Sequence, residues 1–515
     1  MHPLAKLDHR HLWHPFTQMR DWLKAEPIVI VAGQGAVLRD ARGREYLDAN
    51  SSIWTNLHGH NHRRLNAAIR RQLGKVAHSS ALGLANEPAS LLAAKLVQAA
   101  SPANVAQASR LRVKGASPPP FPASRLPHAG SPPALSKVFF SDDGSTAMEV
   151  ALKLAYAFAR RTGRSRRPRF LTLEGAYHGD TVGAVALGHI DLFHKAYAGL
   201  LFKTDRVMAP YCYRCPFNRA RPERADARDY RKCNWECVGK VEQKLAAQKK
   251  RGNPYAGFVF EPLMQGAAGM IPQPAGWLGR ATELARAYGA LLVADEVMTG
   301  FGRTGVSPRE GERPREPKLP GKPGLEGTLA LPLFACQQEG VQPDFMALAK
   351  GLTGGYLPMA ATLTTQPVFD AFLGEYSEFK TFFHGHSFTG NQLGAAAGLA
   401  SLALLQTRAS IGARQRLEQT LRHELQALWR HPNVGDIRQV GLVAGIELVR
   451  DWRTREPFDL RERTGMRVCE AMARRGVLTR PVGNVVVLMP PYCTTEAQAQ
   501  RMVGVLGEAL RRVKG

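Results

Sequence analysis

The chain has 515 residues, a formal net charge of +26 and seven cysteines. This length exceeds what one hydrophobic core usually serves, so we expect two or more domains. No apolar stretch is long enough to span a bilayer, and residues 1–10 lack the apolar core of a signal peptide. We therefore expect a cytoplasmic protein with no membrane partner.

The surplus of positive charge suggests a nucleic-acid partner. Its densest run, from Arg160 to Arg169, lies between a helical pattern and the strand-like residues 170–173, which predicts a surface loop. No recognisable nucleic-acid-binding module accompanies this run, and the other arginines are scattered along the chain. We therefore expect no nucleic-acid partner and attribute the charge to a general enrichment in arginine.

The N-terminal part of the chain predicts an arm followed by a small sheet. Residues 11–18 are too aromatic and too interrupted by proline for a helix, which favours an ordered arm. Residues 28–31, 36–38 and 45–47 predict short strands, and the turn residues between them indicate an antiparallel meander. Trp54 follows among polar residues, where it could line a pocket, although core packing is the commoner fate of a tryptophan.

A helix over residues 88–100 precedes residues 101–136, which are rich in alanine, proline, serine and arginine. No core pattern is visible there, so we interpret the stretch as an inserted, largely disordered loop. After one more strand, Asp142–Ser145 open a helix. Gly144 and Ser145 lie where the free N–H groups and the dipole of that helix favour a phosphate, with a plain serine cap as the alternative.

A turn with an aromatic residue follows the next predicted strand, residues 170–173. In Glu174–Asp180 two glycines bracket Tyr177 and its neighbour His178. An aromatic ring at a strand end could stack on a flat cofactor. Residues 257–260 predict one more strand, and this strand also ends in an acid.

The clearest pattern in the chain is formed by two segments, Leu291–Gly300 and Ala347–Gly355. The first is an apolar run that ends at Asp295 and predicts a strand buried on both faces. Ligands of doubly wound α/β proteins bind at the carboxyl ends of such strands. The second segment holds one lysine, Lys350, among small residues. A strand-end acid and a lysine in a tight loop suit pyridoxal 5'-phosphate (PLP), although a surface acid and a solvated lysine are the alternative.

Four of the seven cysteines are close together in the sequence: Cys212, Cys215, Cys233 and Cys237. Their spacing suits thiolate ligation of a structural zinc ion or an iron–sulfur cluster. A loop with reduced thiols or a disulfide is the alternative. Both interpretations stay open at this point.

In combination, the motifs resemble those of class III aminotransferases of PLP fold type I. The resemblance covers nearly the whole chain apart from the insertions and rests on His11–Thr17, Asp142–Ser145, Tyr177–Asp180, Asp295–Glu296, Thr299–Gly305, Lys350–Gly355, His384–Ser387 and Thr479–Pro481. It implies an α/β fold, with a large domain around a mostly parallel central sheet and a smaller α+β domain from both chain ends. The implied division is an N-terminal arm and part of the small domain at 1–49, a large PLP-binding domain at 50–405 with insertions at 102–136, 205–240 and 306–331, and a C-terminal small domain at 406–515.

The resemblance also implies the roles of the catalytic residues. Lys350 is expected to form the covalent link to the PLP aldehyde and then to carry the substrate proton. Asp295 is expected to pair with the ring nitrogen, and Tyr177 to stack on the ring.

Further residues are implied to bind the cofactor and the substrates. The phosphate is expected to be held by Gly144, Ser145, His386 and Ser387, of which the last two come from the partner subunit of a homodimer. The residues expected to contact substrate are Phe16, Ile53, Trp54, Tyr177, Arg303, Lys350, Gly385 and Arg480.

Within the family, the motifs are most similar to those of the branch that converts 8-amino-7-oxononanoate to 7,8-diaminononanoate in biotin biosynthesis. The expected amino donor is S-adenosyl-L-methionine, which most of that branch uses. Three residues differ from those of relatives that use S-adenosyl-L-methionine. Phe16 stands where those relatives have a tyrosine, Ile53 stands in place of one of two paired tryptophans, and Val487 stands in place of an aromatic residue. With the sequence of His384–Ser387, these changes resemble relatives that use L-lysine. Lysine is therefore the alternative donor, and another class III ω-aminotransferase is the alternative enzyme.

Overall fold

The structure is a computed structural model that describes residues 1–101, 132–305 and 332–513. The predicted insertion at 306–331, and all but the last five residues of the one at 102–136, lie outside the described residues. Within the described ranges, no helix is both long enough and apolar enough to cross a membrane.

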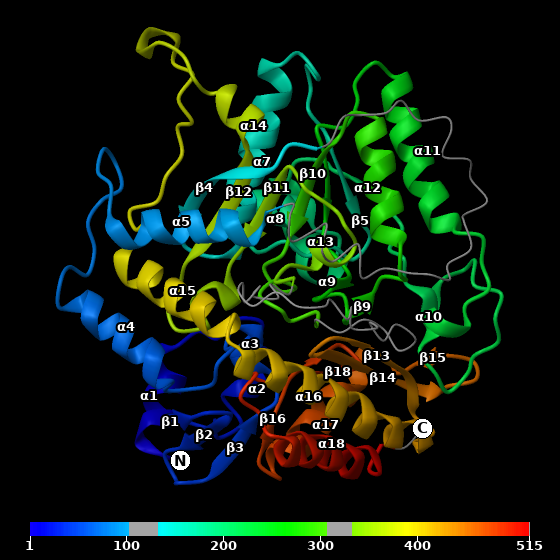
Figure 1. Cartoon of the computed structure of the whole chain (residues 1–515). Coiled ribbons are helices and arrows are strands. Elements are labelled where there is room, and N and C mark those ends of the chain that lie inside the picture. Colours follow the sequence, from blue (N-terminus) through cyan, green and yellow to red (C-terminus); the bar gives the residue numbers. More distant parts are fainter. Residues whose placement is uncertain (102–131, 306–331, 514–515) are drawn as a thin grey trace, which may run out of the picture.

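A seven-stranded sheet forms the centre of the large domain (Figure 1). Its strands lie in the order β4 (Leu135–Ser141), β12 (Ala360–Thr365), β11 (Phe345–Leu348), β10 (Leu291–Asp295), β7 (Gly257–Phe260), β5 (Phe170–Leu173) and β6 (Asp205–Val207). The strands from β11 to β6 are parallel, and β12 runs antiparallel to both of its neighbours. The predicted α/β fold with a mostly parallel sheet is confirmed.

Strand β10 is apolar along its length and does not alternate between apolar and polar residues, because it is buried on both faces of the sheet. All five of its residues are buried. Leu291 and Val293 pack into the core on one face of the sheet, and Leu292 and Ala294 into the core on the other face. A parallel strand covered on both faces is hydrophobic along its whole length.

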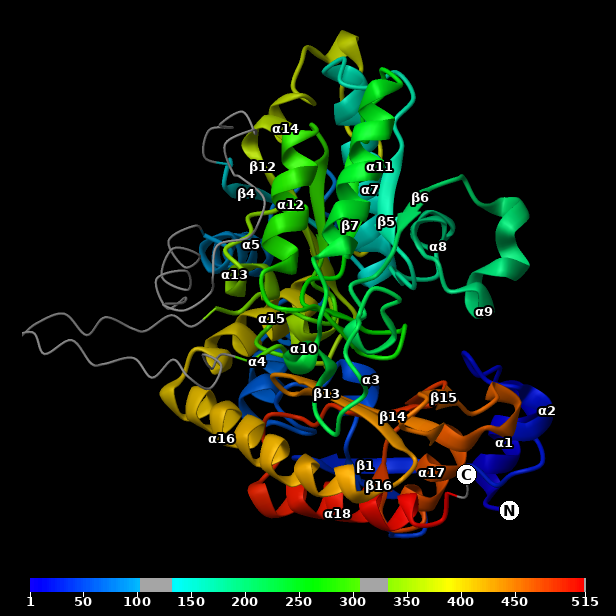
Figure 2. The ribbon, with the colours of Figure 1, turned by 90° about the vertical axis from the view of Figure 1, so that its right-hand side faces the viewer.

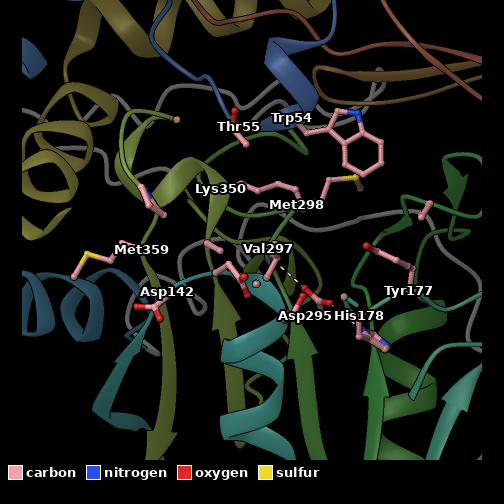
Figure 3. Close-up of a pocket in the computed structure, with 18 of the residues that line it drawn as sticks. Trp54, Thr55, Asp142, Tyr177, His178, Asp295, Val297, Met298, Lys350 and Met359 are labelled. Carbon is pink, nitrogen blue, oxygen red and sulfur yellow. Dashed lines mark hydrogen bonds and ion pairs between the residues drawn. The ribbon is translucent and has the colours of Figure 1, made fainter. Parts of the chain in front are cut away.

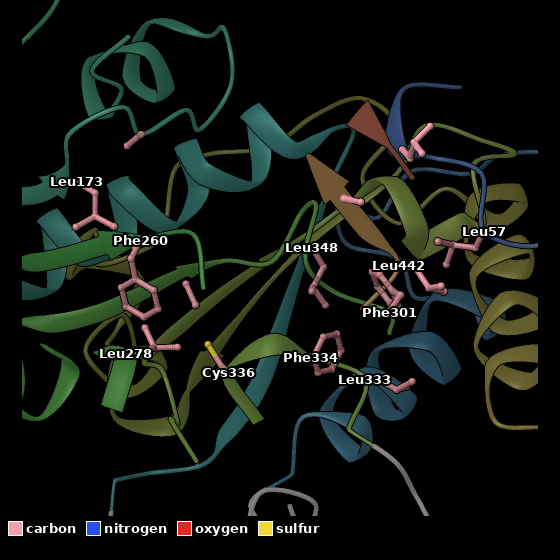
Figure 4. Packing of buried hydrophobic residues seen from close by; sticks show 14 of the residues in the cluster. Leu57, Leu173, Phe260, Leu278, Phe301, Leu333, Phe334, Cys336, Leu348 and Leu442 are labelled. Carbon is pink, nitrogen blue, oxygen red and sulfur yellow. The ribbon is translucent and has the colours of Figure 1, made fainter. Parts of the chain in front are cut away.

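Helices cover both faces of the sheet. One face packs on α7 (Gly144–Arg161), and the other on α5 (Glu87–Ala99), α11 (Glu236–Lys250) and α12 (Trp277–Ala287). Figure 4 shows the second of these cores, where Phe260, Leu278 and Phe334 lie among the strands and helices.

The two ends of the chain meet in a second, smaller unit. The predicted meander is β1 (Ile30–Gln34), β2 (Val37–Asp40) and β3 (Glu45–Asp48), all antiparallel. The late strand β16 (Val477–Leu478) adds to β3 in parallel, with Val477 opposite Leu47. The predicted contribution of both chain ends to one unit is therefore confirmed, while the domain boundaries stay a prediction.

A second sheet belongs to the same unit. Its strands are β13 (Val434–Val440), β14 (Val443–Asp451), β18 (Val485–Leu488) and β17 (Pro481–Val482), with the short β15 (Glu456–Pro457) paired to β14. Its helices are α16 (Arg408–Leu425), α17 (Thr464–Ala473) and α18 (Glu496–Leu510). Figure 2 shows these elements beside the N-terminal strands, below the large sheet. The remaining elements are α1 (Pro3–His11), α2 (Met19–Trp22), α3 (Ser51–Trp54), α4 (Arg63–Leu73), α8 (Val182–Leu187), α9 (Asp191–His194), α10 (Ala227–Tyr230), α13 (Ala335–Gln338), α14 (Gln366–Asp370), α15 (Gln392–Leu405), β8 (Met264–Gln265) and β9 (Ile271–Pro272).

Two of the elements that the sequence did not lead us to expect are α1 and β6. Helix α1 ends at His11, where the predicted arm begins, and of its residues only Ala5 is buried. Strand β6 occupies the first three residues of the predicted insertion at 205–240 and pairs with β5 in the large sheet. Two of its three residues, Asp205 and Arg206, are charged, which hides it from a search for apolar runs.

Candidate active site

A cavity of about 420 Å³ lies at the carboxyl ends of β7, β10 and β11 (Figure 3). Ligands bind at this edge in sheets of this kind. The cavity is lined by six predicted site residues from five segments of the chain: Trp54, Gly144, Ser145, Tyr177, Asp295 and Lys350. The fold therefore brings the predicted lysine, acid, aromatic ring and helix N-terminus to one place.

Asp295, the last residue of β10, is held by two hydrogen bonds. His178 Nδ1 donates to its Oδ2 at 2.8 Å, and the Val297 N–H donates to its Oδ1 at 3.0 Å. Both side chains are buried. No role was predicted for His178, although it lies in the same glycine-bracketed turn as Tyr177. A carboxylate fixed in this way can pair with a cationic ring nitrogen of a ligand in the cavity.

Lys350 follows β11 and lies with its Nζ 5.6 Å from the centre of the Trp54 ring. Its backbone φ is 42°, an uncommon value for a residue with a side chain and one that is often found at functional sites. Burial lowers the pKa of Lys350, and the nearby carboxylates of Asp295 and Glu261 oppose this shift only in part. The lowered pKa increases the fraction of neutral amine, which is the form needed for attack on a carbonyl or for proton transfer.

The N-terminus of α7 faces the cavity, with Gly144 and Ser145 in its first turn. The helix is capped by Asp143, whose side chain accepts a hydrogen bond from the Thr146 N–H at 2.8 Å, and not by Ser145. The Ser145 hydroxyl instead accepts from the Asp180 N–H at 3.1 Å. Because Asp143 carries the cap, the first turn can offer its N–H groups and dipole to a phosphate.

Tyr177 forms one wall of the cavity. Its hydroxyl donates to Asp180 Oδ2 at 2.7 Å, and its ring lies edge-on to Phe193 with the ring centres 6.3 Å apart. Phe193 in turn lies edge-on to Phe16 of the N-terminal arm, with 5.3 Å between the centres. This row of rings brings the exposed Phe16 toward the cavity, although Phe16 is not part of its lining.

Glu261, directly after β7, is a buried acid of the cavity wall whose importance was missed. Its carboxylate accepts hydrogen bonds from the N–H groups of Tyr177 at 3.3 Å and Gly266 at 2.7 Å. Burial raises the pKa of Glu261 to about 7, against the opposing effect of His178. This carboxyl group can therefore change its charge near neutral pH. The available signal was an acid at the end of an apolar run, which Glu261 shares with Asp295.

The segment that carries Trp54 has an unusual backbone. Ser51, Ser52, Ile53 and Trp54 have φ values of 47°, 47°, 62° and 67°. We call these four residues the left-handed turn. Each residue with a side chain costs about 1–2 kcal/mol in a left-handed helical conformation, so the surroundings must stabilise the turn. The turn directs the Trp54 ring to the cavity wall, while Ile53 is exposed.

Two predicted substrate-binding arginines lie outside the cavity lining. Arg303 is 1% exposed, and its Nη1 and Nη2 donate to the backbone oxygens of Pro490 at 2.8 Å and Asn56 at 2.9 Å. These bonds link the large domain to segments from both chain ends. Arg480 is exposed, directly before β17. The substrate roles of both stay predictions.

The segment with Gly385, His386 and Ser387 also lies outside the cavity lining of its own chain. Gly385 and Ser387 are exposed. His386 Nδ1 lies 3.4 Å from Oδ2 of Asp142, a residue that lines the cavity. The segment therefore reaches the edge of the site, and its predicted role in a partner subunit stays a prediction.

The predicted metal centre at the clustered cysteines is not supported. Among the described residues, no group of three or more His, Cys, Asp or Glu side chains is arranged to hold a metal ion. Cys212, Cys215, Cys233 and Cys237 are free thiols that line one small cavity with Arg231 and other residues. Burial raises the pKa of Cys212 and of Cys237 to about 12.

Comparison with known proteins identifies the family. The family model described as aminotransferase class-III matches residues 19–307 and 332–510. The chain belongs to the class III aminotransferases. One relative, the adenosylmethionine-8-amino-7-oxononanoate aminotransferase of Geobacter sulfurreducens, is 43% identical over 512 residues, which cover 99% of this chain and 98% of the relative.

Solved structures agree with the class III assignment. The adenosylmethionine-8-amino-7-oxononanoate aminotransferase of Methanocaldococcus jannaschii is 34% identical, with a TM-score of 0.81 and 99% of each chain covered. An amine transaminase from an uncultivated Pseudomonas species, in the PLP-bound form, is 29% identical, with a TM-score of 0.78 and coverage of 97% of this chain and 98% of the other. This class III protein is therefore a PLP-dependent transaminase.

The side chains around the cavity fit that cofactor. A buried carboxylate, an amine with a lowered pKa and a helix N-terminus face one space of about 420 Å³. The space at the helix end is kept by Gly144, where a Cβ would lie 2.7 Å from Val297 Cγ1. The class III site is thus shaped for a flat ring that carries a phosphate on one side.

Proposed function

We propose that the protein transfers an amino group from S-adenosyl-L-methionine to 8-amino-7-oxononanoate, giving 7,8-diaminononanoate in biotin biosynthesis. One observation carries the proposal. Lys350, Asp295 and the N-terminus of α7 converge on a single cavity, in a chain that resembles relatives named for this reaction over 99% of its length.

The catalytic residues around the cavity have separate roles in binding the cofactor or in proton transfer. PLP, when bound, supplies an electrophilic aldehyde and an electron-withdrawing ring. Lys350 would hold the cofactor covalently and, with its amine free, would carry a proton on Nζ. Asp295, held by His178, would pair with the ring nitrogen, and Tyr177 would orient the ring.

Further residues of the proposed site bind the cofactor phosphate, the substrate carboxylate and the substrate chain. Gly144 and Ser145 bind the phosphate through the N-terminus of α7. Arg480 pairs with the substrate carboxylate, for which an exposed guanidinium offers two parallel donors. Trp54 forms the apolar wall along the substrate chain.

The proposal includes a homodimer in which His386 and Ser387 of the partner subunit complete the phosphate site. Support comes from the surface around this segment. Phe383 and Phe388 are 71% and 59% exposed, which is costly for two phenylalanines in water. At Gly385, no heavy atom of the described residues, outside its two chain neighbours, lies within 4 Å of the position of a Cβ. A second chain would cover this segment.

The reaction is tested by following the colour of the bound cofactor. The PLP-loaded protein is mixed separately with S-adenosyl-L-methionine, L-lysine and γ-aminobutyrate. We expect S-adenosyl-L-methionine to bleach the colour and 8-amino-7-oxononanoate to restore it. Bleaching by lysine alone would replace the donor, and bleaching by γ-aminobutyrate alone would indicate another ω-aminotransferase. No bleaching of a demonstrably bound cofactor would contradict the proposal.

The covalent role of Lys350 has its own test. Borohydride reduction of the PLP-loaded protein, followed by digestion and mass spectrometry, should place the adduct on the peptide that contains Lys350. The Lys350→Ala variant should lose both the adduct and turnover. An adduct on another lysine of the wild-type protein would overturn this assignment.

A further inference from the structure

The left-handed turn, Ser51–Trp54, is the longest run of non-glycine residues with positive φ among the described residues. Glycine is the residue that adopts this conformation without a steric cost, and none of the four residues is glycine. Such a run persists only where neighbouring groups fix it. The groups that fix this one can be identified from its hydrogen bonds.

Asp48, the last residue of β3, is the main anchor of the left-handed turn. Its Oδ1 accepts from the Ser52 N–H at 3.0 Å, and its Oδ2 accepts from the Ser52 hydroxyl at 2.8 Å. His60 Nε2 donates to the same Oδ2 at 3.0 Å. Burial alone would raise the pKa of Asp48, but the hydrogen bonds from His60 and Ser52 outweigh that effect and lower it. The carboxylate of Asp48 therefore stays charged and accepts both hydrogen bonds from Ser52.

Two further hydrogen bonds join Trp54 to Asn50, the residue directly before the turn. The Trp54 N–H donates to the Asn50 backbone oxygen at 2.8 Å, and its indole Nε1 donates to Asn50 Oδ1 at 2.9 Å. The ring packs over Gly266, where a Cβ would lie 3.4 Å from Cζ3 of the tryptophan. The ring position is thus set by the backbone of the turn and by the two hydrogen bonds to Asn50.

The turn is also packed against the lysine loop. A Cβ at Gly355 would lie 2.7 Å from the backbone of Thr55 and Asn56, the residues that follow the turn. The Trp54 ring lies 5.6 Å from Lys350 Nζ. A shift of the turn would therefore move a cavity wall relative to the reactive amine. Asp48 itself does not line the cavity, so its effect on the site is indirect, and the turn that it bonds reaches the cavity wall.

We propose that Asp48 is a positioning residue, whose carboxylate holds the left-handed turn and thereby fixes Trp54 as the wall against which the substrate chain packs. The inference deepens the proposed function, on which it rests for the identity of the substrate. A wall that contacts substrate equally in the ground state and the transition state contributes to KM and little to kcat.

The kinetic test compares Asp48→Ala with the double variant Asp48→Ala/Ser52→Gly in the PLP-loaded full chain. We expect Asp48→Ala to lower kcat/KM for 8-amino-7-oxononanoate by about tenfold to a hundredfold, the scale expected for a displaced positioning group, mainly through KM. Glycine at residue 52 accepts a positive φ, so the double variant should recover most of this loss. Asp48→Asn, which keeps an acceptor for the Ser52 N–H, should lose less than alanine.

Asp40→Ala is the matched control, because Asp40 is also buried in the N-terminal meander. It bonds Arg42, Arg44 and Tyr46 and does not contact the left-handed turn. We expect this variant to lower the melting temperature and to leave KM unchanged. An Asp40→Ala variant with the same KM increase as Asp48→Ala, or a double variant without recovery, would overturn the proposal.

A second measurement does not depend on the reaction. In protein labelled with 5-fluorotryptophan, the ¹⁹F signal of Trp54 is assigned by its absence from Trp54→Phe. We expect one signal in the wild type, a shifted or divided signal in Asp48→Ala, and the wild-type signal in the double variant. An unchanged signal in Asp48→Ala would contradict the proposal. If the wild type does not aminate 8-amino-7-oxononanoate, the proposed function fails, and the ¹⁹F spectra still decide whether Asp48 positions Trp54.

Discussion

His178 and Asp295 form a buried pair in which Nδ1 of the imidazole lies 2.8 Å from Oδ2 of the carboxylate. The histidine side chain has no exposed surface, so its hydrogen bond to the acid is shielded from bulk solvent. A carboxylate oriented before the ligand arrives does not need to reorganise when it meets a ring nitrogen.

The first prediction separates the hydrogen bond of His178 from its bulk. His178→Leu removes the donor to Asp295, and we expect kcat/KM for transamination to fall about 10- to 100-fold, as for the loss of a hydrogen bond to a charged group. His178→Asn keeps an N–H near the position of Nδ1 and should lose much less. Steady-state kinetics and the absorption spectrum of the bound cofactor check this. Equal losses in the two variants would show that the ring volume matters and not the bond.

The second prediction concerns Glu261 and pH. The pKa of about 7 in the folded protein lies above the ordinary value of 4.5, so between these values the folded state binds more protons than the unfolded state. The free energy of unfolding should therefore fall as pH rises through this window. Glu261→Gln removes the effect, so the variant should gain stability over the wild type from pH 5 to pH 8, by at most about 3 kcal/mol. Melting temperatures of the cofactor-free proteins at several pH values measure the difference, and a constant difference would contradict this prediction.

The third prediction contrasts two arginines. Arg303→Ala leaves the Pro490 and Asn56 backbone oxygens without their charged donor, which should destabilise the protein on the order of 3 kcal/mol. Arg480→Ala should leave the melting temperature unchanged and raise KM for the carboxylate substrate about 10- to 100-fold. Arg461→Ala, another exposed arginine of the C-terminal unit, is the control for KM. A KM effect of Arg303→Ala without loss of stability would contradict this prediction and support a substrate role for Arg303.

The fourth prediction concerns the phosphate end of the site. Gly179 has a φ of 121°, and a Cβ there would lie 2.6 Å from Ser145 Cβ. Gly179→Ala should therefore push Ser145 away and weaken PLP binding about tenfold or more, the effect of losing one to two hydrogen bonds to a charged group. Gly239→Ala in α11, where a Cβ meets no atom within 4 Å in the described structure, is the matched control and should bind PLP normally. A titration of cofactor-free protein with PLP compares the two. Normal binding by Gly179→Ala would show that the contact is easily relieved.

Much of the catalytic core could be predicted because its signals are local. Asp295 ends a continuous apolar strand, and Lys350 follows another strand within a run of small residues, so both lie at the edge of the sheet where ligands bind. Gly144 and Ser145 open a helix after a strand. Each of these signals needs only a few neighbouring residues.

Other parts of the site depend on contacts between distant segments. Glu261 ends an apolar run as Asp295 does, but its raised pKa depends on its burial beside Tyr177 and Gly266, which the sequence does not show. The sequence Ser51–Trp54 contains no glycine or asparagine, the residues that usually indicate a left-handed backbone, so the turn is visible only in three dimensions. The bonds from Arg303 to the backbone oxygens of Pro490 and Asn56 also join distant segments, and the expected place of Arg303 near the substrate stays a prediction.

The parallel pairing of β3 with β16 has a consequence for synthesis on the ribosome. The Leu47 N–H donates to the Gly476 oxygen at 2.8 Å, and the Ala49 N–H donates to the Leu478 oxygen at 2.9 Å. These partners are separated by more than 400 residues. At a synthesis rate of roughly 5–20 residues per second, β16 is therefore made on the order of a minute after β3. During that interval the outer edge of β3 is exposed to other nascent chains. A chaperone that shields this edge should therefore raise the yield of active enzyme more than one that acts after release.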